Sequence, residues 1–125
     1  KKALVSYRLQ RAEETIKEAE SLISNGFYNA AINRLYYACY YAVSALLVRN
    51  DIAAASHAGV KQMLGLHFVV TGKLNSTQGR FYNRLFNDRI TGDYDDFVTF
   101  DRETMDEILP KSIEFVRAIH DLIHV

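Results

Sequence analysis

The stretch from Phe27 to Asn50 constrains the fold most, because it is long, helical in pattern and contains neither glycine nor proline. Its apolar residues cover almost the whole helical circumference. A helix that is apolar nearly all round must be covered by neighbours on more than one face. This stretch therefore predicts a central helix, with two adjoining apolar rows: Ala31, Leu35, Ala38, Ala42 and Leu46, and beside them Ile32, Cys39, Val43 and Leu47.

Four further helices are predicted around this one. Residues 3–24 show apolar positions at helical spacing and end at Asn25-Gly26, a left-handed cap sequence. Ser56 is a good N-cap for a helix that runs to about Val70 and is closed by Gly72. Ser76 or Thr77 caps a fourth helix, which runs to about Ile90 and is followed by the turn-rich acidic loop TGDYDD.

Asp101 or Thr99 caps the last helix, which continues to the C-terminus. Pro110 inside it should either kink the helix or divide it into two pieces. No strand is needed anywhere, since residues 97–100 are too few to carry a sheet alone. The fold expected is an all-α, antiparallel up-down bundle of four to five helices, formed by a single domain over residues 1–125.

The composition argues against several classes of protein: disulfide-bonded, membrane-spanning, and nucleic-acid-binding by charge alone. One cysteine among 125 residues cannot form an internal disulfide, and no apolar run approaches the length of a membrane span. We therefore expect a cytoplasmic protein without a membrane partner. Fifteen basic and fifteen acidic residues argue against binding nucleic acid by bulk charge alone. The acids gather in residues 93–125, which suits either self-association beside a basic surface or a solvated acidic helix.

The central helix carries the first candidate site. Arg34, Tyr37 and Tyr41 form a stripe at the border of its apolar face. In one interpretation the arginine is structural and its guanidinium meets an acid such as Asp93, while the tyrosines pack at the core edge. In the other, the stripe is an anion site with stacking tyrosines.

The predicted fourth helix carries a second arginine cluster. Arg80, Arg84 and Asp88 share a face, and Arg89 lies near the helix end. Arginines this close together can bind phosphate bidentately. The alternative is a solvated helix with an Arg84–Asp88 pair and an Arg89–Asp93 bridge.

Histidine and cysteine give weaker signals. His120 and His124 lie one turn apart, but the paired Glu-x-x-His of a di-iron bundle is missing, so we predict no metal and no cofactor. His57 is expected to be structural, although it could reach a site shared with the central helix. Cys39 on the apolar face is expected to be an inert core thiol.

Residues 31–42 read A-x-N-R-x-Y-Y-A-x-Y-x-A, and are followed by His57-Ala-Gly-Val, Phe68-Val69 and the sequence R-x-x-x-D-Y at 89–94. In these features the chain resembles the HEPN superfamily, and more narrowly its small stand-alone bacterial and archaeal members. The resemblance implies a helical bundle, a homodimer, and pairing with a minimal nucleotidyltransferase as a toxin-antitoxin couple.

Active HEPN proteins carry an R-x(4 to 6)-H motif that cleaves RNA without metal at a dimer cleft. The resemblance places its arginine on Arg89 and its nearest polar partner on Asp93, since no histidine follows at the required spacing. Tyr94 corresponds approximately to a tyrosine that some partner transferases modify with AMP.

Three functions remain open at this point. The first is a nucleotide- or RNA-binding module, paired with a nucleotidyltransferase, which the neutral charge and the missing histidine favour; its expected binding residues are Arg34, Tyr37, Tyr41, His57 and Arg84. The second is a weak metal-independent endoribonuclease, with Arg89, Asp93 and Tyr94 as catalytic residues. Tyr94 or Tyr37, together with His57, would replace the missing histidine. The third is a structural dimerisation domain.

Overall fold

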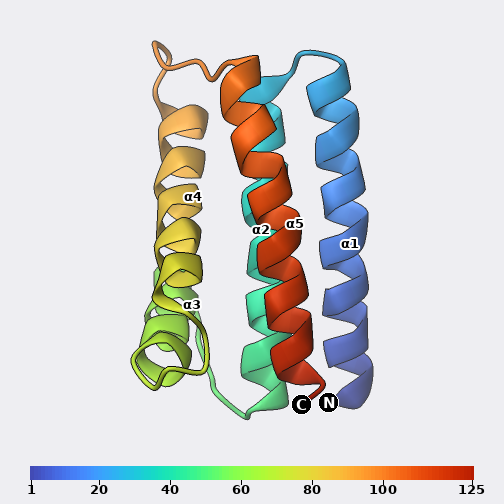
Figure 1. Cartoon of the computed structure of the whole chain (residues 1–125), viewed down its shortest axis with the longest axis vertical. Coiled ribbons are helices and arrows are strands. Elements are labelled where there is room, and N and C mark those ends of the chain that lie inside the picture. The colour runs from blue at the N-terminus through green and yellow to red at the C-terminus, as the bar shows by residue number, and fades with distance from the viewer.

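The computed structural model describes all residues, 1–125, and confirms an all-helical bundle without strands (Figure 1). Five α-helices run in chain order with one π-helical segment between the third and fourth: α1 (Lys2–Ser24), α2 (Tyr28–Arg49), α3 (His57–Leu64), η1 (Gly65–Val69), α4 (Ser76–Tyr94) and α5 (Arg102–Ile123). Both termini lie at the same end of the bundle (Figure 1).

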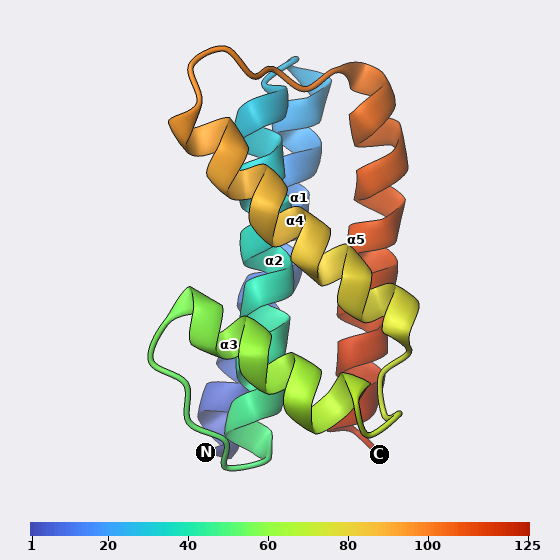
Figure 2. The same cartoon turned by 90° about the vertical axis from the view of Figure 1, so that its left-hand side faces the viewer.

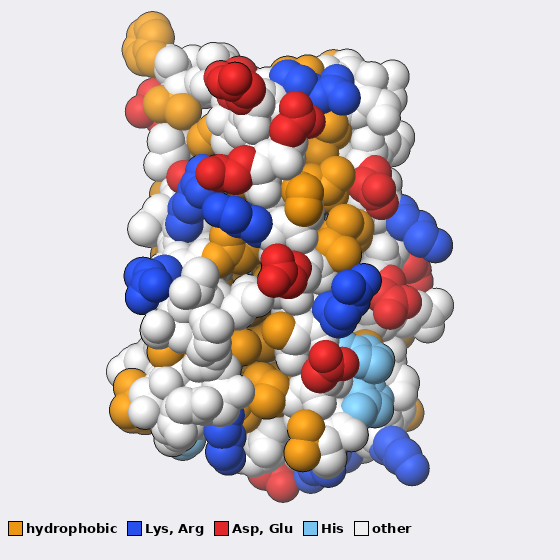
Figure 3. Space-filling view, viewed as in Figure 1, with side chains coloured by type: hydrophobic (Ala, Val, Ile, Leu, Met, Phe, Trp, Pro, Cys, Tyr) orange, Lys and Arg blue, Asp and Glu red, His pale blue; other side chains and the backbone are white.

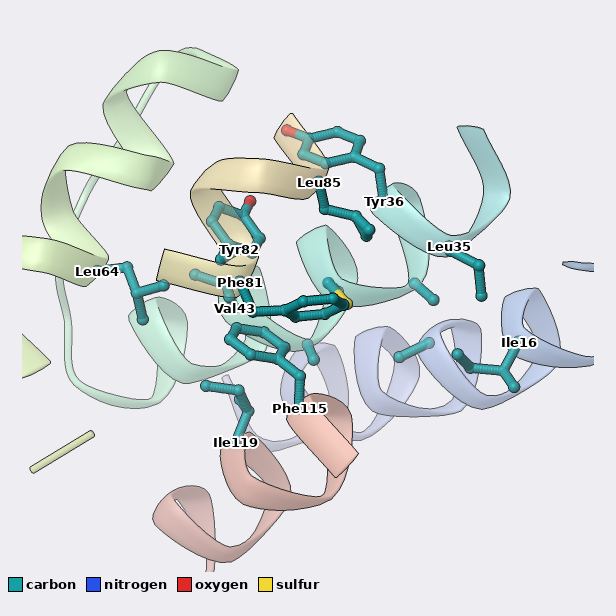
Figure 4. Packing of buried hydrophobic residues seen from close by; sticks show 14 of the residues in the cluster. Ile16, Leu35, Tyr36, Val43, Leu64, Phe81, Tyr82, Leu85, Phe115 and Ile119 are labelled. Carbon is teal, nitrogen blue, oxygen red and sulfur yellow. The ribbon is translucent and has the colours of Figure 1, made fainter. Parts of the chain in front are cut away.

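The central position of α2 is confirmed, because it packs against α1, α3, α4 and α5. Small residues such as Ala38 and Ala42 are fully buried and allow the neighbouring helices to approach closely. The core continues through Tyr82 of α4, whose ring stacks on that of Phe115 of α5 with centroids 5.5 Å apart (Figure 4). Tyr36 of α2 lies at one edge of this cluster and has no exposed surface.

The predicted third helix is present, but it changes from an α-helix to a π-helix after Leu64. Ser56 caps α3 as expected, accepting a hydrogen bond from the Gly59 amide at 2.9 Å. From Gly65 the backbone continues as the π-helical η1. Gly72, with φ of +79°, closes the segment as expected. Figure 2 shows α3 and α4 crossing α2 on the same side and converging where the Val70–Asn75 turn joins them.

Both ends of α4 differ from the prediction. Its N-cap is Asn75, which accepts hydrogen bonds from Thr77 and Gln78, and neither Ser76 nor Thr77 is the capping residue. At the other end α4 continues past Ile90 to Tyr94, so the first part of the expected TGDYDD loop is helical. Gly92 is helical despite the low helix propensity of glycine, and the ring of Phe100 lies so close that a β carbon there would be 3.0 Å from it.

The last helix begins at the Asp101 cap, which accepts a hydrogen bond from the Thr104 amide at 2.8 Å. Of the two outcomes expected at Pro110, a kink or a division, the division does not occur, since α5 is one helix from Arg102 to Ile123. Pro110 is exposed, so water can solvate the carbonyl group that loses its partner there. The buried face of α5, with Ile108 and Phe115 on either side of the proline, holds the helix together.

Charges are mixed across the face that α5 forms with its neighbours (Figure 3). Arg84 of α4 meets Glu107 of α5 at 2.7 Å, so a base from the middle of the chain is neutralised by an acid from its acidic third. None of the helices combines the length and hydrophobicity required to cross a membrane.

Candidate functional site

An aromatic cluster with one buried polar contact lies where α3 and α4 meet α2. The hydroxyl group of Tyr36 is 2.8 Å from Nδ1 of His57, the first residue of α3. Because a buried tyrosine hydroxyl needs a partner, this hydrogen bond fixes the position of the imidazole ring. His57 is only half-buried, so its remaining ring surface faces the outside of the bundle.

Half-buried aromatic rings from two helices surround this pair. The His57 ring stacks on Tyr40 with centroids 4.4 Å apart, and Tyr37 approaches it edge-on at 5.6 Å. Phe86 of α4 meets Tyr36 edge-on at 5.9 Å. The repeat of aromatic residues at three- and four-residue spacing along α2 places these rings on one helix face. The result is a continuous aromatic surface made of half-buried rings.

The mostly buried side chain of Arg89, from α4, packs against the rings of this aromatic surface. Its guanidinium carbon is 4.8 Å from the Tyr36 ring centroid and 5.9 Å from that of Tyr37. Its side chain is only 11% exposed, and its closest carboxylate, that of Asp93, is 3.9 Å away, beyond hydrogen-bonding distance. The Nε atom of Arg89 is buried without a hydrogen-bond partner. The cation is therefore incompletely neutralised by the protein itself.

One carboxylate oxygen of Asp93 lies near side chains of two helices, α2 and α4. This atom, Oδ2, accepts a hydrogen bond from Asn33 of α2 at 3.0 Å, and the same oxygen is the one that lies 3.9 Å from the Arg89 guanidinium. Arg34 does not pair with Asp93, contrary to the structural interpretation of the sequence. Its guanidinium instead meets Glu18 of α1 at 3.6 Å and donates two hydrogen bonds to the side-chain oxygen of Asn33. Asn33 thus links both arginines to one network.

The site favours neutral histidine and neutral tyrosine. Burial, and then the nearby charge of Arg89, hold the pKa of His57 below its ordinary value of 6.5. Burial raises the pKa of Tyr36 to about 12. The imidazole is therefore uncharged at neutral pH and able to accept a proton. The orientation of the shared hydrogen bond then decides which ring nitrogen carries the proton.

The structure brings together five of the residues predicted from sequence: Arg34, Tyr37, His57, Arg89 and Asp93. Tyr41 lies at the edge of this group, 6.1 Å from the Tyr37 ring and beneath Arg11 of α1.

Two other predicted residues point elsewhere. Arg84 lies on the α5 side of α4 and is held by Glu107 and Asp88. Tyr94 is the last residue of α4 and is 77% exposed.

Sequence reasoning did not single out Tyr36, Phe86 or Asn29. Tyr36 carried a signal, since a tyrosine among the apolar positions of a central helix needs a partner for its hydroxyl group. Asn29 carried none. Its side chain donates to the Val98 carbonyl at 2.9 Å and accepts from the Phe100 amide at 3.0 Å, which fixes the loop after α4.

The structure contains no group of three or more histidine, cysteine, aspartate or glutamate side chains placed to hold a metal ion. His120 and His124 stack with centroids 4.2 Å apart on α5. Cys39 is buried, and burial raises the pKa of its thiol group, as expected for an unreactive core cysteine.

Comparison with known proteins agrees with this architecture. Residues 5–122 match the model of the HEPN domain. The chain is 40% identical to a "UPF0332 protein" of Thermotoga maritima, over 98% of this chain and 93% of that protein. Two proteins of Methanocaldococcus jannaschii, each named "Putative toxin", are 32% and 35% identical over 86% and 79% of this chain, and over 74% and 71% of their own lengths. The chain therefore belongs to the HEPN family.

Proposed function

We propose that this HEPN protein is a toxin-like module that binds RNA or a nucleotide at the face formed by Arg89, Arg34, Tyr37, Tyr40 and His57. The observation that carries the proposal is the state of Arg89. A largely buried guanidinium with an unpartnered Nε atom and a carboxylate at 3.9 Å retains the capacity to bind an anion. Phosphate matches the planar donor geometry of arginine.

The aromatic surface supplies the second half of a nucleotide site. Tyr37, Tyr40 and His57 are half-buried, with ring faces close to Arg34 and Arg89. Bases stack on such rings without sequence preference. This arrangement suits a ligand that joins a phosphate group to a planar base.

Asp93 competes with the proposed phosphate group. Both are anions, and both face Arg89. The Asp93→Asn substitution removes the competing charge and retains a side chain that can bond to Asn33. We expect it to tighten the binding of ATP and of a short single-stranded RNA, whereas a purely structural Asp93 would leave affinity unchanged.

Binding is tested by fluorescence anisotropy with a labelled short RNA and with ATP at increasing salt. Arg89→Met should abolish binding, while Arg84→Met should retain it because Glu107 already neutralises that arginine. Affinity of the wild type should fall as salt rises, as for any phosphate contact. Equal affinity of the Arg89→Met variant and the wild type would reject the site.

Metal-independent RNA cleavage is the second candidate function, because His57 and Arg89 flank the same Tyr36 ring. A neutral histidine beside a cation can move the proton of a ribose 2′-hydroxyl group, a contribution typically worth about 100- to 10,000-fold in rate. Cleavage in EDTA that leaves 2′,3′-cyclic phosphate ends and is lost in both His57→Asn and Arg89→Met would establish it. If the wild-type protein does not cleave RNA, binding remains as the only proposed function.

A homodimer and a nucleotidyltransferase partner complete the proposal. The names of the Methanocaldococcus relatives support a toxin-antitoxin pairing. Tyr94, 77% exposed at the end of α4, is accessible to a modifying enzyme. A molar mass from light scattering equal to twice the chain mass of 14.3 kDa would establish the dimer. Addition of AMP by a co-expressed nucleotidyltransferase, absent in Tyr94→Phe, would establish the pairing.

A further inference from the structure

We propose that Asn33 is a positioning residue of the candidate site: it holds the Asp93 carboxylate where it cannot neutralise Arg89, so that the guanidinium group stays available to an anion. The inference rests on the proposed function, because the anion is the ligand proposed for that site. It follows from three observations: the hydrogen bonds of Asn33, the distance between Arg89 and Asp93, and the lack of any other donor to the Asp93 carboxylate.

The side-chain amide of Asn33 is bound at both ends. Its Oδ1 atom accepts two hydrogen bonds from Arg34, one from Nη2 at 2.8 Å and one from Nε at 3.1 Å. Its Nδ2 atom donates to Oδ2 of Asp93 at 3.0 Å. Because an arginine can only donate and an ionised carboxylate can only accept, the two neighbours allow one orientation of the amide group. Arg34 therefore fixes the orientation in which Asn33 presents its donor to Asp93.

Arg34 is itself held by two further groups. Its guanidinium carbon lies 5.0 Å from the centroid of the Tyr37 ring, and its Nη1 atom lies 3.6 Å from a carboxylate oxygen of Glu18. Neither contact involves α4. The orientation of the Asn33 amide is therefore set by α1 and α2, whereas the carboxylate that it binds belongs to α4.

Arg89 and Asp93 do not form a close ion pair, although their spacing allows one. They are four residues apart on α4, the spacing at which oppositely charged side chains meet on a helix surface. The distance from Nη1 of Arg89 to Oδ2 of Asp93 is nevertheless 3.9 Å. This oxygen is the one that accepts the hydrogen bond from Asn33. One hydrogen bond from α2 thus keeps the carboxylate beyond hydrogen-bonding distance of the guanidinium group.

The Asp93 side chain accepts no hydrogen bond from the protein other than that of Asn33. Without it, Arg89 would be the one cation within 4.0 Å of the carboxylate, and a small side-chain rotation would close the ion pair. Hydrogen bonds between a guanidinium and a carboxylate are strong, and the 11% exposure of the Arg89 side chain limits screening by water. An incoming anion would then have to break this pair before it could bind.

The imidazole of His57 reports the state of Arg89 without any ligand. Burial, and then the charge of Arg89, lower the pKa of His57. A carboxylate that closes onto Arg89 brings a negative charge to this cation and weakens its effect on the imidazole. The pKa of His57 should therefore rise when Asp93 closes onto Arg89.

The test is a double-mutant cycle that combines Asn33→Leu with Asp93→Asn. Leucine is similar in size to asparagine, favours the helix and makes no hydrogen bond. In Asn33→Leu we expect ATP affinity to fall about tenfold, the order of one charge-assisted hydrogen bond, and the pKa of His57 measured by NMR to rise. In the Asp93→Asn background the same substitution should change neither quantity, because no carboxylate remains to close onto Arg89.

Asn83→Leu is the matched control, because Asn83 is an exposed asparagine of α4 whose side chain makes no hydrogen bond within the protein. It should leave ATP affinity and the pKa of His57 unchanged. Asn33→Ala repeats the cycle with a smaller side chain, and circular dichroism checks that every variant has the helix content of the wild type.

Equal losses of ATP affinity with and without the Asp93 carboxylate would mean that Asn33 contacts the ligand or supports the fold, and would overturn the positioning role. An unchanged pKa of His57 in both Asn33 variants would overturn it as well. Failure of the wild type to bind ATP would instead count against a nucleotide as the ligand of the proposed function. The pKa of His57 across the cycle would then still decide whether Asn33 positions Asp93.

Discussion

The hydroxyl group of Tyr36 and Nδ1 of His57, 2.8 Å apart, connect the central helix to the first residue of α3. Tyr36 is fully buried, whereas His57 is half-buried, so the hydrogen bond joins the core to the surface of the candidate site. The position of the imidazole ring beside Arg89 and Tyr40 therefore depends on packing inside the bundle.

Tyr36→Phe removes this hydrogen bond without changing the shape of the core. We expect a loss of about 0.5 to 1.5 kcal/mol in the free energy of unfolding, the usual contribution of one hydrogen bond. Urea denaturation monitored by circular dichroism measures it. Tyr40→Phe is the control, because the half-buried Tyr40 stacks on His57 through its ring and its hydroxyl group makes no hydrogen bond within the protein. Equal losses in both variants would contradict the role of the Tyr36–His57 bond.

The lowered pKa of His57 predicts a pH dependence of stability. The folded state holds this pKa below the ordinary value of 6.5 that applies to the unfolded chain. At a pH between the folded-state and unfolded-state pKa of His57, the unfolded chain binds more protons than the folded protein. The free energy of unfolding therefore decreases as the pH drops below about 6.5. NMR titration of the ring protons measures the pKa directly. In Arg89→Gln it should rise toward the ordinary value, although burial still holds it down. No upward shift in that variant would show that Arg89 does not act on His57.

Arg89→Met tests whether Arg89 is kept for function or for stability. The substitution removes a mostly buried charge and an unpartnered Nε atom and retains an apolar stem of similar length. Because an unsatisfied buried donor costs about 1–3 kcal/mol, we expect the melting temperature to stay the same or rise. Loss of RNA binding in a protein of equal or greater stability would mark a functional residue. A stability loss above about 2 kcal/mol would indicate a structural one.

Asn29→Ala should loosen the loop that follows α4. Both of its loop hydrogen bonds, to Val98 and from Phe100, would be lost. We expect a stability loss of about 1–3 kcal/mol and faster amide exchange across residues 95–100, with helix content unchanged. Hydrogen exchange with mass spectrometry measures it. Unchanged exchange in this loop would show that Asn29 does not hold it.

Gly79→Ala should destabilise the packing of α4 on η1. A β carbon there would lie 2.9 Å from the Val69 side chain, and overpacking of this kind costs about 1–3 kcal/mol. Gly65→Ala is the control, since its β carbon would meet nothing within 4 Å and should not destabilise the protein. Thermal melting of the two variants side by side measures the difference. Equal melting temperatures would show that η1 moves freely relative to α4.

The order and type of the helices could be predicted because local patterns decide them. The apolar circumference of residues 27–50 indicated a central helix, and the caps at Ser56 and Asp101 placed two helix starts correctly. Two details of α4 were wrong: its N-cap is Asn75 and not a neighbouring hydroxyl residue, and it continues to Tyr94, where the ring of the distant Phe100 lies close to Gly92. At Pro110, where a kink or a division was expected, α5 does not divide.

Part of the candidate site could also be predicted. The helical spacing predicted that Arg34 and Tyr37 belong together, and the family resemblance pointed to Arg89 and His57. The fold brings all four residues together. Their partners could not be predicted, since a sequence does not state which acid an arginine meets. Arg34 pairs with Glu18 and not Asp93, and Arg84 turns toward Glu107.

The sequence by itself determined the helical bundle and the family, because helix periodicity, capping residues and a motif within one helix are local properties. Only the tertiary structure decided that Tyr36 holds His57, and that Arg89 lies beneath an aromatic surface with an unpartnered Nε atom. These relationships join residues from α2, α3 and α4, and they depend on how the three helices cross, a geometry set by the packing of side chains far apart in the chain.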